Sequence, residues 1–79
     1  MKAKKNNIAR QVPLCALIWG NIKKYQYTDS ISDEDLSKIL DVNIRTIYNY
    51  NNHPEKLSTE KIQMFIDATG ITKEQLIAD

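Results

Sequence analysis

The chain has 79 residues, 42% of them apolar, with a net charge of +1 and a single cysteine. This length supports one hydrophobic core, and no apolar run approaches the roughly 20 residues that a membrane-spanning helix needs. One cysteine excludes an internal disulfide, and the single histidine, His53, has no second histidine or nearby cysteine with which to bind a metal. We therefore expect one cytoplasmic domain with no metal, no cofactor and no membrane partner.

Charge is unevenly distributed along the chain. Residues 1–28 hold six of the eleven basic residues, whereas all ten acidic residues follow residue 28. We expect residues 1–11 to form a flexible basic arm and residues 12–79 to form the folded domain. The basic residues of the arm are Lys2, Lys4, Lys5 and Arg10. Each could neutralise a nucleic-acid phosphate, although a solvated terminus without a partner fits the composition equally well.

Apolar residues recur at spacings of three and four, and glycine and proline number only two each, which predicts an all-α fold. The first helix is expected to begin near Pro13, because proline suits a first helical turn, and to end before the turn-forming residues 27–30. Its expected apolar face consists of Leu14, Leu17, Ile18, Ile22 and Tyr25, with Trp19 beside it.

The second helix is expected to follow a cap at Ser32 and to run to about Leu40. Its first turn carries three acids, Asp33, Glu34 and Asp35, which face the positive end of the helix dipole. The residues expected to be buried on this helix are Leu36, Ile39 and Leu40.

After a break at residues 41–43, Asn43 is expected to cap a third helix that runs from Ile44 to about Asn51. Ile47 and Tyr50 should point inward, and a loop should follow because Pro54 cannot continue a helix.

A fourth helix is expected from about Ser58 until Gly70, which is a natural left-handed terminator. Its apolar stripe is Ile62, Phe65 and Ile66, with Met64 flanking it. Thr72 and Gln75 form a capping box for a short fifth helix, whose Leu76 and Ile77 are expected to dock inward.

The second and third helices fit a helix-turn-helix, in which two helices joined by a three- or four-residue turn cross steeply. This geometry needs apolar residues at definite places and a small residue where the two helices approach closely. The apolar positions are Leu36, Leu40, Val42, Ile47 and Tyr50, and the small residue is Ser37.

The outward side of the third helix favours DNA. The candidate base contacts are Asn43, Ile44, Arg45, Thr46 and Asn49. Arginine pairs with guanine, asparagine pairs with adenine, and a threonine or isoleucine methyl contacts thymine. No acid lies between Asn43 and Asn52, where a carboxylate would face phosphate. Tyr48, exposed on the same helix, is a candidate for a hydroxyl contact with phosphate.

Two segments carry a resemblance to a known family. Residues 36–52 read LSKILDVNIRTIYNYNN and residues 62–78 read IQMFIDATGITKEQLIA. The first resembles the helix-turn-helix of the Cro and phage-repressor (XRE) family, and the second is similar to that family's fourth and fifth helices. The resemblance implies a compact five-helix lambda-repressor-like domain with its third helix in the major groove. It also implies phosphate contacts from Asn52, Lys56 and the start of the second helix.

Three features depart from the family pattern. The turn commonly has glycine where this sequence has Asp41, which tolerates a left-handed conformation at some cost. The second helix usually begins with a glutamine that contacts phosphate, whereas residues 33–35 are acids that would repel it. The loop after the third helix is often strongly basic, but residues 52–56 hold one cation and one acid.

The leading hypothesis is a Cro-like or repressor-like regulator of phage, prophage or bacterial transcription that binds a double-stranded DNA operator. Binding as a homodimer is compatible with it. One alternative is a protein-interaction module, such as an antirepressor or adaptor, that uses the acidic start of the second helix. Another is a recombination directionality factor that bends DNA. We expect no enzyme activity and no small-molecule substrate, because the acids at residues 29–35 have no nucleophile or histidine nearby.

Overall fold

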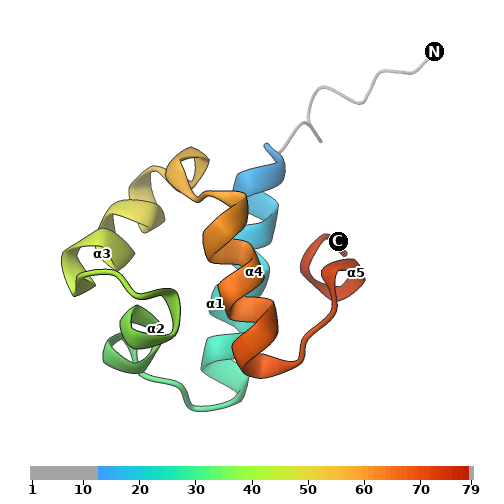
Figure 1. The fold of residues 1–79 in the computed structure, drawn as a ribbon. Helices are drawn as coiled ribbons and strands as arrows, with labels where there is room; N and C mark the ends of the chain where they lie inside the picture. Colours follow the sequence, from blue (N-terminus) through green and yellow to red (C-terminus); the bar gives the residue numbers. More distant parts are fainter. Residues whose placement is uncertain (1–12, 79) are drawn as a thin grey trace.

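The computed structural model describes residues 13–78, and within them every regular element is a helix (Figure 1). The α-helices are α1 (Leu14–Thr28), α2 (Asp33–Leu40), α3 (Ile44–Asn52), α4 (Thr59–Thr69) and α5 (Lys73–Leu76). A short 3-10 helix, η2 (Pro54–Lys56), lies where the sequence predicts a loop. The all-α prediction is confirmed for this part of the chain. The predicted basic arm, with Lys2, Lys4, Lys5 and Arg10, lies outside the described residues.

Local side-chain caps begin four of the five α-helices, and the sequence predicts three of them, at Ser32, Asn43 and Thr72. The cap residues before α2, α3, α4 and α5 are Ser32, Asn43, Ser58 and Thr72. Each side-chain oxygen accepts a backbone N–H of the first turn, which has no partner within the helix. Gln75 completes the capping box, because its side chain accepts the backbone N–H of Thr72 at 3.0 Å.

Left-handed residues end two of the helices. Asp41 ends α2 with φ 55° and Gly70 ends α4 with φ 79°, at the two positions where the sequence predicts a left-handed conformation. Ser30, in the turn after α1, also has a positive φ of 58°. Both Ser30 and Asp41 pay a steric cost that glycine would not, since their Cβ atoms crowd the backbone in this region.

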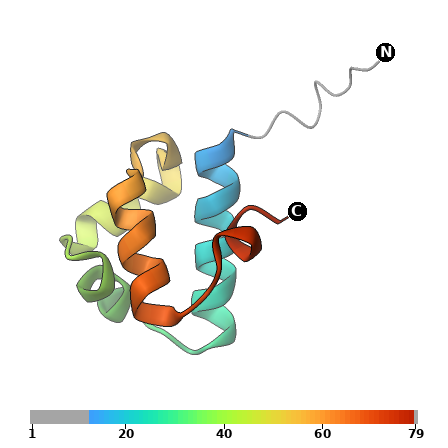
Figure 2. The ribbon, with the colours of Figure 1, turned by 45° about the vertical axis from the view of Figure 1, so that its right-hand side comes forward.

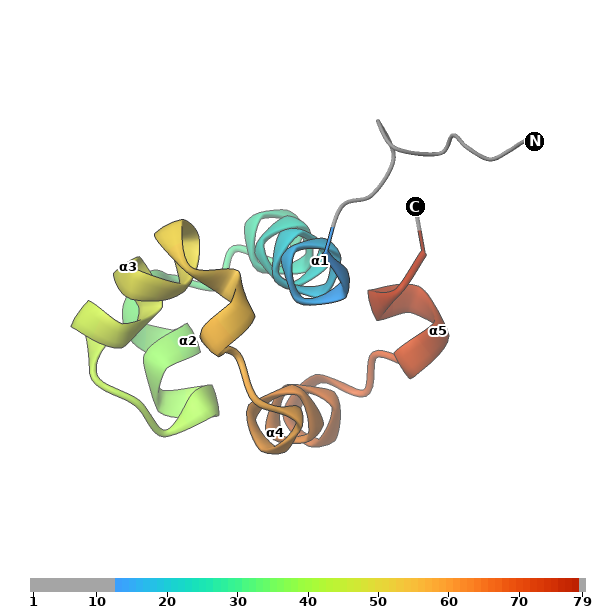
Figure 3. The same cartoon turned by 90° about the horizontal axis from the view of Figure 1, so that it is seen from above.

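Helices α1 and α4 run in the same direction through the middle of the molecule (Figure 2). Seen from above, α2 and α3 lie on one side of this pair and α5 lies on the other (Figure 3). Helix α2 packs against α3 and α4, whereas η2 contacts α1 and α3. Helix α3 therefore lies at the outer edge of the molecule, with one face against the core and the other toward solvent.

The core receives at least one fully buried side chain from each α-helix. These residues are Ile22, Leu36, Leu40, Ile47, Phe65 and Leu76. Burying such a side chain stabilises the fold by about 1.5–3 kcal/mol relative to leaving it in water. Leu57 and Ile71, in the segments on either side of α4, are also buried and were not predicted, because no helical periodicity marks an apolar residue in a loop.

The predicted burial of two residues is wrong. Leu14, at the start of α1, is 60% exposed, and Ile77, just after α5, is 49% exposed. Leu14 begins α1 one turn before Ile18, the first buried residue of the helix, and the other described residues leave most of its side chain exposed. Ile77 is the next residue after buried Leu76, and one residue of helix turns a side chain by about 100°.

Candidate functional site

The outward face of α3 presents four exposed polar side chains. They are Arg45, Tyr48, Asn49 and Asn52, at the three- and four-residue spacing that places them on one face of a helix. Ile47 and Tyr50 occupy the opposite face and are buried, as predicted. The structure thus brings together two of the predicted base contacts and two of the predicted phosphate contacts in one exposed stripe.

The other predicted base contacts lie beside this stripe. Ile44 and Thr46 are partly buried, so each offers only part of its side chain to a ligand. Asn43 is exposed, but its Oδ1 accepts the backbone N–H of Arg45 at 2.7 Å and caps the helix. Two-point recognition of adenine needs both the oxygen and the nitrogen of the amide. Asn43 can therefore offer only its amide nitrogen without giving up the cap, whereas the Asn49 side chain forms no hydrogen bond within residues 13–78.

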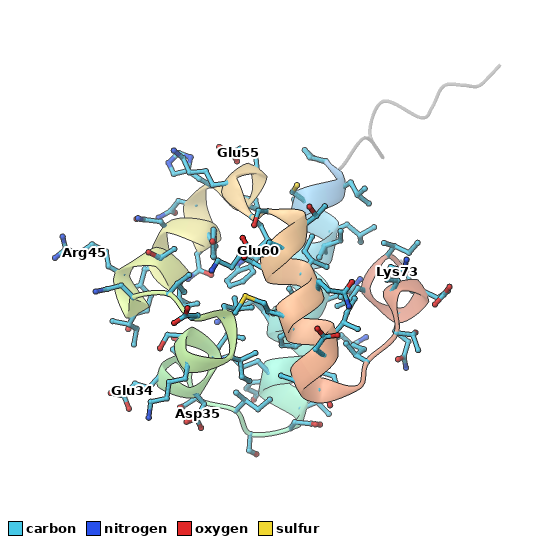
Figure 4. All side chains as sticks on the ribbon, viewed as in Figure 1. Glu34, Asp35, Arg45, Glu55, Glu60 and Lys73 are labelled. Atoms are coloured by element: carbon cyan, nitrogen blue, oxygen red, sulfur yellow. The ribbon has the colours of Figure 1, made fainter. Side chains whose placement is uncertain are left out.

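Arg45 projects away from the body of the protein at the outer side of α3, and Glu34 and Asp35 project from the start of α2 below it (Figure 4). Lys56, a predicted phosphate contact, is exposed in η2. Glu55, its neighbour, has a carboxylate oxygen 3.2 Å from Nδ1 of the His53 ring. Both of those side chains are more than half exposed, so this pair contributes little to stability.

The inner side of α3 is attached to α1 through Trp19. The indole Nε1–H of Trp19 donates to Oδ1 of Asn51 at 2.9 Å. The Trp19 ring also packs edge-on against Tyr50, with the ring centroids 5.1 Å apart, and burial raises the pKa of the Tyr50 hydroxyl. The end of α3 is thereby held in orientation and register by a specific polar contact as well as by apolar packing.

The start of α2 is also attached to α1, through Asp33. Its carboxylate accepts hydrogen bonds from Gln26 Nε2 at 2.6 Å and from Lys23 Nζ at 2.9 Å. These two donors hold the pKa of the Asp33 carboxyl below its ordinary value. The three acids expected to act together at the start of α2 are therefore not equivalent, because Asp33 turns back toward α1 while Glu34 and Asp35 are exposed.

Three of these supporting residues were not singled out from the sequence: Lys23, Gln26 and Asn51. Gln26 is only 6% exposed, and its Oε1 accepts no hydrogen bond from the described residues. Helical spacing would have placed Lys23 and Gln26 on the Trp19 side of α1, since the three are four and three residues apart. It could not have shown that Asp33 lies opposite them.

Residues 13–78 also hold one cysteine and two surface depressions. No group of three or more histidine, cysteine, aspartate or glutamate side chains is placed there to hold a metal ion. Cys15 is half-buried, and its thiol points to the Leu57 carbonyl at 3.9 Å. Two surface depressions, of about 330 and 500 Å³, lie along α1, and neither is lined by a residue of α3. No helix in this part of the chain is long and apolar enough to span a membrane.

Comparison of the chain with protein-family models, with curated proteins and with solved structures finds no match.

Proposed function

We propose that α2, the connection at residues 41–43 and α3 form a helix-turn-helix, and that the protein uses it to bind a double-stranded DNA operator and regulate transcription. The burial of Leu36, Leu40, Ile47 and Tyr50 supports the motif, as does the left-handed conformation of Asp41 in the turn. Ser37 is compatible with a close approach of the two helices. Its side chain is small and half-buried, and its hydroxyl donates to the Glu34 carbonyl of the same helix at 2.6 Å.

The observation that carries the proposal is the exposed, acid-free stripe of α3. Arg45 has five donors in a planar fork that matches the acceptor edge of guanine, and the Asn49 amide matches the donor and acceptor edge of adenine. Tyr48 and Asn52 lie on the same exposed face, with groups that can donate to phosphate. In the proposed complex α3 enters the major groove, since a helix edge that projects from the body fits that groove.

A titration with the DNA that flanks the protein's own gene tests this proposal, with a random-sequence duplex of equal length for comparison. Arg45→Ala should weaken specific binding by about 1–3 kcal/mol and leave the far-UV circular dichroism unchanged, because the side chain is exposed. Lys73→Ala is the matched control: it also removes one cation, but on the side of the protein away from α3 (Figure 4). Binding to neither duplex at low salt would refute the proposal.

A second candidate function rests on the exposed acids of α2. Glu34 and Asp35 project into solvent next to α3 and form no ion pair with the described residues. They suit a basic surface on a partner protein, which is the chemistry an antirepressor or adaptor needs. Replacing both with Gln and Asn separates the two functions, since this change should strengthen binding to DNA and weaken binding to a basic partner.

A further inference from the structure

One face of α1 connects the two ends of the α2–α3 pair. Trp19, Lys23 and Gln26 lie on this face, and Trp19 bonds to Asn51 at the end of α3 while Lys23 and Gln26 bond to Asp33 at the start of α2. Lys23 also lies over the Trp19 ring, with Nζ 5.8 Å from its centroid. The Lys23 ammonium is thus held between an aromatic ring and a carboxylate.

We propose that Lys23 is a built-in counter-ion that cancels the charge of Asp33, so that the start of α2 can approach a DNA phosphate. This role rests on the proposed function. Lys23 is a positioning residue in it: the ammonium acts on Asp33 and does not itself contact the DNA.

Geometry supports this assignment over a direct phosphate contact. The Lys23 Nζ and the Asp33 Oδ1 are 2.9 Å apart, and both side chains are about one-third exposed. Gln26 fixes the same oxygen from a second direction at 2.6 Å. To contact a phosphate, the ammonium would have to leave both the carboxylate and the ring. The charge-assisted hydrogen bond and the cation–π attraction both oppose that movement.

The neighbouring residues show what the pair changes. Glu34 and Asp35 point away from the protein and pair with no cation of the described residues, whereas Asp33 pairs with Lys23. Only one of the three acids in the first turn therefore has its repulsion toward phosphate removed. Since interactions between unit charges in water fall off with distance and with salt, the effect should be largest at low ionic strength.

The role of Lys23 is tested by comparing the DNA affinities of four proteins: wild type, Lys23→Gln, Asp33→Asn and the double variant. We expect Lys23→Gln to weaken DNA binding about three- to fivefold at low salt, the effect of one uncancelled charge near a phosphate in water. Asp33→Asn should tighten binding by a similar factor, and the double variant should bind like the wild type. The differences should shrink as salt is raised. Circular dichroism establishes that each protein is folded.

A measurement without DNA tests whether Lys23 and Asp33 interact directly or only contribute two independent charges. The pKa of Asp33, followed by NMR of its carboxyl carbon, should rise in Lys23→Gln. It should stay unchanged in Lys24→Gln, which removes the adjacent exposed cation from the same helix.

Three results would overturn the proposal. A double variant as weak as Lys23→Gln would make Lys23 a direct DNA contact. Unchanged binding in Lys23→Gln would mean that DNA does not respond to the Asp33 charge, and an unchanged Asp33 pKa would mean that the two groups are not coupled. Failure of the wild type to bind DNA is a different outcome, because it refutes the proposed function and this role with it.

Discussion

The hydrogen bond between Trp19 and Asn51 can be tested through Asn51→Ala, which removes the acceptor and leaves the indole in place. The indole Nε1–H donates to Oδ1 at 2.9 Å, and Trp19 is 5% exposed. A typical hydrogen bond stabilises a folded protein by about 0.5–1.5 kcal/mol. A buried donor left without an acceptor costs more, about 1–3 kcal/mol. We expect the lower half of that range, because Asn51 itself is exposed and water can replace part of the contact.

Helix propensity acts in the opposite direction and must be subtracted. Alanine is better than asparagine inside a helix by up to about 0.7 kcal/mol, so Asn51→Ala gains this amount while it loses the hydrogen bond. Asn49→Ala is the matched control: it makes the same change two residues earlier on the exposed face of α3. Asn49→Ala should stabilise the protein slightly, and Asn51→Ala should be less stable than this control by about 1 kcal/mol.

Urea unfolding followed by circular dichroism measures the difference, and fluorescence of Trp19, the only tryptophan, should change in Asn51→Ala alone. Adding Trp19→Phe to both asparagine variants completes the cycle: without the indole donor, the difference between them should largely vanish. Equal stabilities of Asn49→Ala and Asn51→Ala in the presence of Trp19 would refute the view that this bond holds α3 against α1.

Two further predictions concern α2. Asp41→Gly should raise the free energy of unfolding by up to about 1 kcal/mol, measured by urea unfolding, because φ 55° costs glycine nothing; a loss of stability would show that the Asp41 side chain contributes more than its strain. Asp33→Asn should lower stability at pH 7 by less than about 1 kcal/mol, since the ion pair is one-third exposed. The folded pKa of Asp33 is depressed, so its contribution is present above the unfolded value of about 3.9 and is lost as pH falls through the folded value. The gap between wild type and Asp33→Asn should therefore close in unfolding experiments at acid pH, and a gap that persists there would contradict the assignment.

Several helix boundaries were predictable because they are set by neighbouring residues, but α1 extends to Thr28, into the turn-forming residues before which the sequence predicts its end. Ser32, Asn43 and Thr72 each cap the helical turn that directly follows them, and Gly70 ends α4 through its own backbone freedom. The candidate stripe of α3 follows in the same way, since 3.6 residues per turn place Arg45 and Asn49 on one face whatever lies behind the helix. These features depend on contacts only a few residues apart in the chain.

Tertiary structure alone decided what covers each face and which charges meet. Periodicity placed Leu14 on an apolar face of α1, but within residues 13–78 its side chain is 60% exposed. Periodicity did not predict that the Trp19 indole would donate to Asn51, 32 residues away, or that Lys23 would lie against Asp33. Burial and ion pairing depend on how the helices cross. That arrangement minimises the free energy of the whole core, so the sequence of a single helix does not determine it.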